Sequence, residues 1–527
     1  MVIAPDGVPV LGMVINNQFP GPLIEANWGD TLRIHVYNNL TNYNGTSIHW
    51  HGIRQLNTNW QDGVAGVTQC PISIGDSYVY EFRATQYGTS WYHSHFALQY
   101  PDGLIGPLKI NGPTSANYDV DIGPLLITDW SHKNAFSLFY LELEGNPPVP
   151  DSYLMQGKGI YCSPSNVCTG SRHVVEFQYG KTYKLSIVNS GTSSQYTFWI
   201  DGHTFQVVGT DFVPINPYVT DTLNIAIGQR YDIIVTANAT FEHGTNFWMH
   251  ARSCSNETIA STLGIIRYDP ASTADPYTPP GNRVGYGCLD PAVGDLVPVV
   301  PMQVGVAVND LSPAEYLNVS MRYYPNITQE SPLKRWVIKG SSMYVNWSEP
   351  SLKLLTDYDA TEASFPQDLV PIFLDYPEMS WVYFLIEGNF TPTASNIIPE
   401  PVAHPIHLHG HDFVILDQSS IPFDPATFNP NLNNPPRRDT AMLPKGGYLV
   451  IGFQMNNPGT WLMHCHIAWH ASSGMAVQFI ESPRVLHNMV EASGIVPEMN
   501  NQCDTWTNRY NTVNIPAQAV QGDESGI

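Results

Sequence analysis

Short apolar runs alternate with clusters of turn-forming residues along most of the chain. Residues 31–37, Thr-Leu-Arg-Ile-His-Val-Tyr, form one such run, and Asn38 and Asn39 end it. Runs rich in Val, Ile, Tyr, Phe and Thr that are bounded by Gly, Pro and Asn predict the antiparallel strands of β-sandwiches. Extended helical periodicity is hard to find, and 43 Pro and 41 Gly indicate many loops. The pattern predicts an all-β protein.

Two elements of this pattern each occur three times. The first is a Gly-Thr turn leading into an aromatic strand, at residues 88–95, 244–252 and 459–466. The second precedes it in each case, at residues 48–52, 200–203 and 406–410. Internal similarity of this kind indicates repeated structural units. We therefore expect three consecutive, related β-sandwich domains, at residues 1–125, 126–305 and 306–527, of which the middle one has lost most of its histidines.

Histidines cluster in the two outer repeats. Ten of the 18 occur in four segments, at residues 49–51, 93–95, 404–409 and 464–470. Residues i and i+2 of a strand face the same side, so each His-X-His pair presents two imidazoles to one point. Imidazole is a preferred ligand of copper, zinc and iron. One such pair is as often a strand with two hydrogen-bonded side chains, but four at equivalent places in the outer repeats indicate metal binding.

The remaining eight histidines lack this arrangement, and we interpret them as structural or surface residues. They are His35, His132, His173, His203, His243, His250, His411 and His487.

The last histidine segment is the most specific one. Cys465, His470 and the more distant His404 supply one thiolate and two imidazoles, and Met475 lies ten residues after the cysteine. Two His and one Cys with a long axial Met are typical of a blue-copper electron-transfer site. His464 and His466 flank Cys465 and point to the opposite face of the strand. One strand is therefore expected to join two metal centres.

These segments, in their order and spacing, resemble those of the multicopper oxidases, and in particular the fungal laccases of the ascomycete type. The resemblance covers essentially the whole chain and implies three cupredoxin-like Greek-key domains that hold four copper ions. It implies that His404, Cys465 and His470 bind a type 1 copper, and the blue-copper ligand pattern adds Met475 in the axial position. It further implies a trinuclear cluster between domains 1 and 3, with His49 and His407 on the type 2 copper and six histidines on the type 3 pair, namely His51, His93, His95, His409, His464 and His466.

The same resemblance implies one-electron oxidation of phenols or aromatic amines at the type 1 copper, coupled to reduction of dioxygen to water at the cluster. We expect electrons to enter through His470, and Trp469 either lines the substrate pocket or belongs to the core. Phenols lose a proton with the electron, so an acidic residue near His470 would help; we choose Asp211, with Asp221 as its competitor. Asp62 resembles the family's acidic residue that supplies protons at the cluster, although an Asp-Gly turn is the plain alternative.

Three further features follow from the resemblance. Met475 stands where fungal relatives usually have Leu or Phe, which predicts a lower type 1 potential. The chain ends Asp523-Glu524-Ser525-Gly526-Ile527, similar to a tail that plugs the channel to the cluster, although chain ends are usually frayed. If Cys465 is reserved for chemistry, 7 − 1 leaves six cysteines, and the family pairs them as Cys70–Cys503, Cys254–Cys288 and Cys162–Cys168.

Composition narrows the setting in which such a protein works. Acidic residues outnumber basic ones 46 to 23, for a formal charge of −23, which argues against nucleic-acid binding. No apolar run is long enough to span a membrane, and the first residues are not a signal peptide. Eight Asn-X-Ser/Thr sequons favour a secreted protein whose leader has been removed, and we expect a monomer. The sequons begin at Asn39, Asn44, Asn238, Asn256, Asn318, Asn326, Asn346 and Asn389.

Two other readings remain open at this stage. A related oxidase could take electrons from ferrous iron, ascorbate or bilirubin; a ferroxidase should carry carboxylates beside His404 or His470, and the neighbouring sequence has none. A copper carrier or electron shuttle would account for Cys465 but would leave the cluster histidines without a role.

Overall fold

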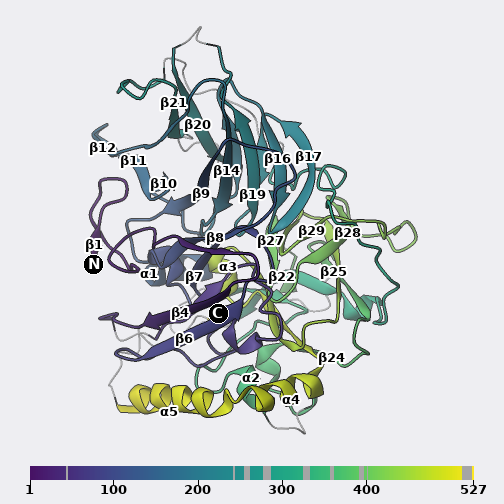
Figure 1. Ribbon diagram of the computed structural model, residues 1–527. Coiled ribbons are helices and arrows are strands. Elements are labelled where there is room, and N and C mark those ends of the chain that lie inside the picture. Colours follow the sequence, from purple (N-terminus) through teal and green to yellow (C-terminus); the bar gives the residue numbers. More distant parts are fainter. Residues whose placement is uncertain are drawn as a thin grey trace.

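The computed structural model describes residues 1–42, 45–240, 244–254, 262–276, 287–324, 333–356, 361–390, 397–399, 402–512 and 525–527. His243 and three of the sequon asparagines, Asn44, Asn256 and Asn326, lie outside these residues. The described part of the chain forms three β-sandwiches in succession (Figure 1). The expectation of a three-domain, all-β fold is confirmed.

The first sandwich contains a four-stranded sheet in the order β3-β8-β7-β5 and the antiparallel pair β4-β6, preceded by the hairpin β1-β2. The run at residues 31–37 is strand β4, as predicted. The strands are β1 Val2–Ile3, β2 Val10–Leu11, β3 Ile24–Asn27, β4 Thr31–Tyr37, β5 Ile48–Trp50, β6 Ser77–Arg83, β7 Gly88–Ser94 and β8 Ile105–Asn111.

The second sandwich pairs an eight-stranded sheet, β12-β11-β10-β9-β14-β19-β16-β17, with a five-stranded one, β13-β21-β20-β15-β18. Strand β9 begins before the predicted domain limit at residue 125, and the domain limits remain predictions. The strands are β9 Val120–Trp130, β10 Ser152–Met155, β11 Lys158–Cys162, β12 Cys168–Gly170, β13 His173–Glu176, β14 Thr182–Asn189, β15 Tyr196–Ile200, β16 Phe205–Thr210, β17 Val213–Thr220, β18 Leu223–Ile225, β19 Arg230–Thr236, β20 Asn246–Ser253 and β21 Thr262–Arg267.

The third sandwich combines a sheet in the order β23-β22-β25-β31-β28-β29, with β26 beside β22, and a five-stranded sheet, β24-β33-β32-β27-β30. The strands are β22 Leu317–Tyr324, β23 Leu333–Ile338, β24 Pro371–Leu374, β25 Trp381–Glu387, β26 Ile397–Ile398, β27 His404–Leu408, β28 Phe413–Ser419, β29 Arg437–Arg438, β30 Thr440–Leu443, β31 Tyr448–Gln454, β32 Gly459–Cys465 and β33 Ala476–Glu481.

The sequence repeat corresponds to one strand pair in each sandwich. The Gly-Thr segments form or lead into β7, β20 and β32, and the elements that precede them lie in or at the end of β5, β15 and β27. Each pair is antiparallel, so the equivalent side chains of the three sandwiches face the same relative position. The histidines of the outer repeats are therefore placed by the register of two homologous strand pairs.

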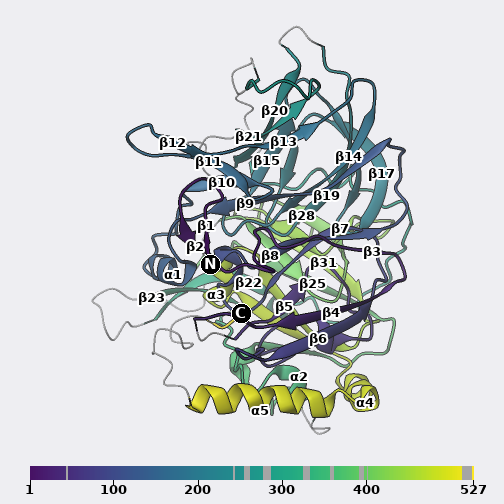
Figure 2. The ribbon, with the colours of Figure 1, turned by 60° about the vertical axis from the view of Figure 1, so that its left-hand side comes forward.

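Helices occur at the edges of the sandwiches, and one of them ties the chain end to the beginning. They are α1 Ala135–Leu143, α2 Ser351–Leu354, α3 Ala468–Ser472, α4 Pro483–Ser493 and α5 Val496–Thr512. In both ribbon views α5 runs along the bottom of the molecule, below β6 and α2 (Figure 2). The disulfide Cys70–Cys503 attaches α5 to the first sandwich, and Cys162–Cys168 and Cys254–Cys288 form the other expected bridges. No described helix is both long and apolar enough to cross a membrane.

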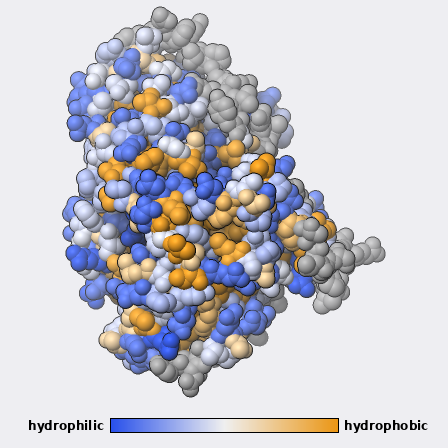
Figure 3. Space-filling model, turned by 90° about the vertical axis from the view of Figure 1, so that its right-hand side faces the viewer, coloured by the Kyte–Doolittle hydropathy of each residue, from blue (hydrophilic) through white to orange (hydrophobic). Residues whose placement is uncertain are grey.

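One apolar core cluster extends through the third sandwich into the first, where Trp91 and Phe96 belong to it, and the first and second sandwiches each have a further cluster of their own. On the outside, hydrophobic residues gather in the middle of one face, surrounded by hydrophilic ones (Figure 3). The shared core holds the outer sandwiches together at the place where their histidine-bearing strands meet.

Candidate metal centre

Eight histidines of the first and third sandwiches meet in one buried cluster. Strand register places His49 opposite His93 and His407 opposite His464. Across the interface, ring centroids lie 4.0 Å apart both between His51 and His407 and between His49 and His409. The eight residues are at most 5 % exposed; they are His49, His51, His93, His95, His407, His409, His464 and His466.

In several of these rings, one nitrogen lies within hydrogen-bond distance of an acceptor, and the other has no hydrogen-bond partner among the described residues. Nδ1 of His49 is 2.8 Å from the carbonyl oxygen of Asp62, Nδ1 of His93 is 3.0 Å from that of Ser94, and Nδ1 of His407 is 2.8 Å from that of Asp439. Their Nε2 atoms are buried and have no hydrogen-bond partner among the described residues. Metal-binding histidines typically donate their second N–H in this way, so this donor set fits a metal.

Burial lowers the pKa of six of the eight cluster histidines. It lowers the pKa of His464 to about 3, and it lowers the pKa of His93 and His409 well below the ordinary value, with neighbouring imidazoles adding to the effect. A neutral imidazole has the free lone pair that coordination needs. These six histidines are therefore available to a metal ion as neutral ligands.

Two carboxylates connect the histidines of one sandwich with those of the other. Asp62 lies 2.9 Å from Nδ1 of His409 and 3.2 Å from Nδ1 of His49. Asp439 lies 3.2 Å from Nε2 of His51 and 3.5 Å from Nδ1 of His407. Each carboxylate thus holds one histidine of the first sandwich and one of the third.

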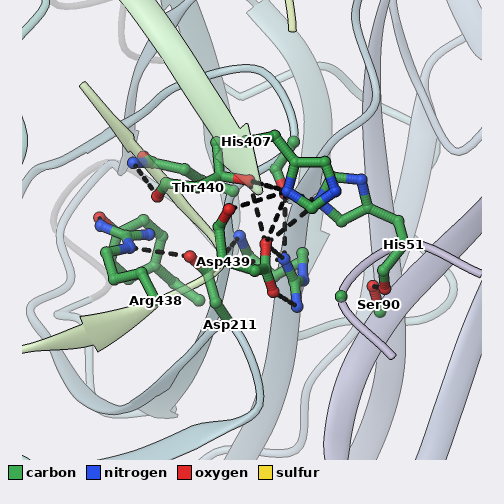
Figure 4. A network of polar contacts seen from close by, with 12 residues as sticks. His51, Ser90, Asp211, His407, Arg438, Asp439 and Thr440 are labelled. Carbon is green, nitrogen blue, oxygen red and sulfur yellow. Dashed lines mark hydrogen bonds and ion pairs between the residues drawn. The ribbon is translucent and has the colours of Figure 1, made fainter. Parts of the chain in front are cut away.

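Asp439 continues into a buried chain of alternating charges (Figure 4). Arg230 of the second sandwich binds it with both terminal nitrogens, at 2.6 and 2.7 Å. Asp211 accepts from the backbone N–H of Arg230 and from Nε of Arg438, each at 2.8 Å. Burial alone would raise the pKa of Asp439, but Arg230, His407 and His51 outweigh it and hold that pKa well below its usual value.

This placement corrects the prediction that Asp211 accepts protons beside His470. Asp211 is completely buried and its two oxygens are engaged by the arginines described above. Its competitor Asp221 lies in an exposed turn between β17 and β18. The carboxyl group that does approach His470 is Glu142 of α1, at 3.8 Å from Nε2.

The second group of candidate ligands lies within the third sandwich. Nδ1 of His404 is 3.1 Å from Nδ1 of His470, and the Cys465 sulfur lies 3.7 and 3.5 Å from these two atoms. All three side chains are buried, and Cys465 is the one free cysteine of the seven, all of which are described. Burial raises the pKa of its thiol, so a bound metal would have to displace the proton.

The backbone of Met475 is hydrogen-bonded to two residues of this group. Its N–H donates to the carbonyl of His470 at 3.0 Å, and its carbonyl accepts from the N–H of Cys465 at 3.2 Å. The Met475 side chain is fully buried. The two hydrogen bonds bring the methionine beside both predicted ligands.

A tryptophan that sequence reasoning missed covers the outer side of this site. The Trp336 ring lies 4.3 Å from the His470 ring and 4.8 Å from that of His404, and its Nε1 donates to Glu142 at 2.9 Å. Burial raises the pKa of Glu142. Trp469, in contrast, is 3 % exposed and belongs to the apolar core, which is the second of its two predicted readings.

The last three residues are docked beside the cluster. Ser525 donates through its N–H and its hydroxyl to the carbonyls of Ser472 and Ala471, at 2.7 and 2.9 Å. Trp347 donates to the carbonyl of Gly526 at 3.0 Å. Ile527 is 3 % exposed and lines a cavity of about 20 Å³, together with His93, His95, His464 and His466. That volume suits a water-sized molecule.

Asp439, Arg230, Glu142 and Trp336 are the main residues that sequence reasoning missed. Two signals could have shown the charged ones. Arg437, Arg438 and Asp439 are three consecutive charged residues directly before the apolar strand β30, and Arg230 begins the apolar strand β19. Charged residues are rarely buried without partners, so such positions predict buried ion pairs.

Comparison with known proteins agrees with this geometry. Three family models, each described as multicopper oxidase, match residues 2–115, 121–271 and 344–485. Oxidoreductase GME11365 of Pestalotiopsis microspora is 55 % identical, over 100 % of this chain and 88 % of its own length. Dihydrogeodin oxidase of Aspergillus terreus is 51 % identical, over 100 % and 89 %. The crystal structure of the laccase from Botrytis aclada is 41 % identical, covers 100 % of this chain and 93 % of its own, and superimposes with a TM-score of 0.86. The chain belongs to the multicopper oxidase family.

Proposed function

We propose that the protein is a laccase-type oxidase, which removes single electrons from phenols or aromatic amines and uses four of them to reduce dioxygen to water. The observation that carries the proposal is strand β32. Cys465 lies in the group with His404 and His470, whereas its neighbours His464 and His466 lie in the histidine cluster. A covalent path of adjacent residues thus connects an electron-accepting site with an oxygen-reducing one.

The donor sets support four copper ions in the expected arrangement. His404, Cys465 and His470 would hold the type 1 copper, with Met475 beside them, because two imidazoles and a thiolate are the ligands of blue copper. His49 and His407 would hold the type 2 copper. The type 3 pair would be held by the remaining histidines of the cluster, His51, His93, His95, His409, His464 and His466. When bound, the coppers supply the one-electron chemistry and the site of oxygen reduction.

The residues around His470 have a role in binding the reductant. His470 is 8 % exposed, and its ring edge is the part of the type 1 site nearest to solvent. Glu142 lies beside that edge, so it would accept the hydrogen bond of a phenol hydroxyl and orient it toward the imidazole. Asp62 would hold protons where oxygen is reduced, and its contacts with two cluster histidines support this role.

Ferrous iron is the alternative donor that one observation favours. The sequence shows no carboxylate near His404 or His470, but the fold brings Glu142 to His470. We prefer an organic donor because Glu142 already accepts a hydrogen bond from Trp336, and because the relatives that are at least 40 % identical include laccases and a dihydrogeodin oxidase.

We also propose that the protein is secreted, and that it works as a monomer. Four sequon asparagines are exposed, namely Asn39, Asn238, Asn346 and Asn389. Three disulfides suit an oxidising compartment.

A donor panel tests the assignment. Oxygen uptake is measured with a phenol, an aromatic amine, ferrous iron, ascorbate and bilirubin, and the absorption spectrum is recorded for the blue band. We expect a blue protein that consumes oxygen fastest with the phenol or the amine. A protein without the blue band, or one that takes electrons only from ferrous iron, would contradict the proposal.

A further inference from the structure

We propose that Arg230, from the sandwich that supplies no copper ligand, is a positioning residue for the trinuclear cluster: it fixes the Asp439 carboxylate, which orients His51 and lies beside His407. This inference rests on the ligand set proposed above. Asp439 and Arg230 touch no substrate, so their role is to hold the ligands.

Arg230 grips Asp439 in a geometry that leaves the carboxylate little freedom. Its two terminal nitrogens contact the two carboxylate oxygens at 2.6 and 2.7 Å, and both side chains are about 1 % exposed. Bidentate guanidinium–carboxylate pairs fix orientation as well as distance. Nη1 and Nε of Arg230 also donate to the carbonyls of Gly228 and Thr89, at 3.2 and 3.3 Å, so the guanidinium itself is held in place.

The fixed carboxylate then determines which nitrogen His51 offers to a metal. Asp439 can only accept, so His51 donates from Nε2, and its Nδ1 keeps the lone pair. That Nδ1 faces Nε2 of His466 at 3.3 Å. His49 and His93 present the opposite nitrogen, Nε2. His51 therefore depends on Asp439 for the tautomer that the cluster requires.

Two glycines make room for this arrangement. A Cβ atom at Gly52 would lie 2.4 Å from Nη2 of Arg230 and 2.4 Å from Oδ2 of Asp439. A Cβ atom at Gly228 would lie 2.9 Å from the ring of His466 and 3.1 Å from that of His51. Both glycines have positive φ angles, 77° and 86°. The absence of side chains at Gly52 and Gly228 therefore leaves the space in which Arg230 contacts Asp439 beside the cluster histidines.

The next ion pair in the chain of charges supplies a matched control. Arg438 is as deeply buried as Arg230 and binds Asp211 and the hydroxyl of Tyr231. None of its described contacts reaches a cluster histidine or the carboxylate of Asp439. Replacing Arg438 removes one positive charge from this network, as replacing Arg230 does. Arg438, however, binds Asp211 and not Asp439, the carboxylate next to the cluster (Figure 4).

The test compares the copper-loaded wild type with Arg230→Gln, Arg230→Lys, Asp439→Asn, the double variant Arg230→Gln/Asp439→Asn and Arg438→Gln. Copper per protein, the electron paramagnetic resonance spectrum of the type 2 copper, the near-ultraviolet absorption of the type 3 pair and copper release to a chelator are measured. The blue band of the type 1 copper reports that the third sandwich is folded. Arg230→Lys keeps the charge and carries the test if Arg230→Gln does not accumulate.

We expect both Arg230 variants and Asp439→Asn to keep the blue band, to lose cluster copper to the chelator about 10–100-fold more readily, and to show altered type 2 spectra. The double variant should be no worse than Asp439→Asn, because Arg230 acts through that carboxylate. Arg438→Gln should keep wild-type cluster spectra even if it melts at a lower temperature. Wild-type cluster spectra in both Arg230 variants, or the same loss in Arg438→Gln, would overturn the inference. A wild type that binds no cluster copper would instead refute the proposed function.

Discussion

The two groups of candidate copper ligands are held together in different ways. His404, Cys465 and His470 belong to one sandwich, where β27 and β32 share a hydrogen-bonded ladder. The cluster histidines come from two sandwiches that share no such ladder between β5 or β7 and β27 or β32 among the described strands. The carboxylates Asp62 and Asp439 link them across the gap. Strand register is therefore enough to build a site within a domain, whereas a site between domains also needs charged side chains.

The two sites nevertheless both receive a side chain from the same sandwich. The second sandwich, which contributes no ligand, supplies Arg230 to the cluster and Glu142 of α1 to the type 1 site. Although the second sandwich lacks the ligand histidines of the outer two, it contributes a side chain to each site. It adds one buried charged side chain to the surroundings of each site.

The largest effect is expected from the variant that removes the residue linking the two sites, Cys465. Cys465→Ser takes away the thiolate but leaves His464 and His466 in the cluster. We expect the blue band to disappear and oxygen uptake to fall to background, with cluster copper retained. Absorption, copper analysis and oxygen consumption measure this. A variant that still turns over at the wild-type rate would break the comparison.

The next change removes a carboxylate from the interdomain site alone. Asp62→Asn replaces the group that holds His49 and His409, and we expect turnover or cluster affinity to fall about 10–100-fold with an unchanged blue band. Glu481→Gln is the matched control, since Glu481 is a buried carboxylate that holds His411, outside both sites, at 2.8 Å. Equal losses in both variants would show that general stability, and not the cluster, is affected.

Glu142→Gln changes the surroundings of the type 1 site without touching its ligands. The amide can still accept from Trp336, but a charged acceptor for the substrate hydroxyl is lost. Such a hydrogen bond is worth about 1.5–3 kcal/mol, so we expect kcat/KM for phenols to fall about 10–100-fold. Ferrocyanide, which has no hydroxyl group, serves as the control donor. An equal fall with ferrocyanide would assign Glu142 to the type 1 site itself.

A smaller effect is expected at the chain end. Deletion of Gly526 and Ile527 removes the side chain that lines the small cavity beside the cluster. Anions such as azide should then bind the cluster severalfold faster, as followed by stopped-flow absorption, while the blue band is unchanged. Identical binding rates in the two proteins would mean that ligands enter by another path.

The smallest change is Met475→Leu. The thioether stabilises oxidised copper more than a leucine does, so its loss should raise the type 1 potential. A rise of about 59 mV corresponds to a tenfold change in the equilibrium constant of a one-electron couple. Redox titration of the blue band measures it. An unchanged or lower potential would contradict a contact between the Met475 thioether and the type 1 copper.

The sequence was informative wherever a local pattern determines the structure. Alternation of apolar and turn-forming residues predicted strands such as β4, and the His-X-His spacing predicted which imidazoles share a face. Each of these depends only on neighbours in the chain, because a strand has a period of two. The repeat then predicted that both outer sandwiches supply histidine ligands.

What the sequence did not predict depends on contacts between distant residues. Glu142 reaches His470 from α1, a helix whose short periodic stretch gives little signal. Asp211 occupies the tight turn between β16 and β17, with a φ of 47°, where its carboxylate turns inward to two arginines. An acidic residue in the expected region of sequence was thus mistaken for the one beside the type 1 site.

The bridge between Cys70 and Cys503 has a consequence for the order of events during biosynthesis. Its partners are 433 residues apart, and a ribosome adds about 5–20 residues per second, so the first cysteine is made about 20–90 s before the second. The histidine-bearing face of the first sandwich stays unpaired until β27 and β32 have been made. The covalent link between the first sandwich and α5 therefore forms only after the strands of all three sandwiches have been synthesised.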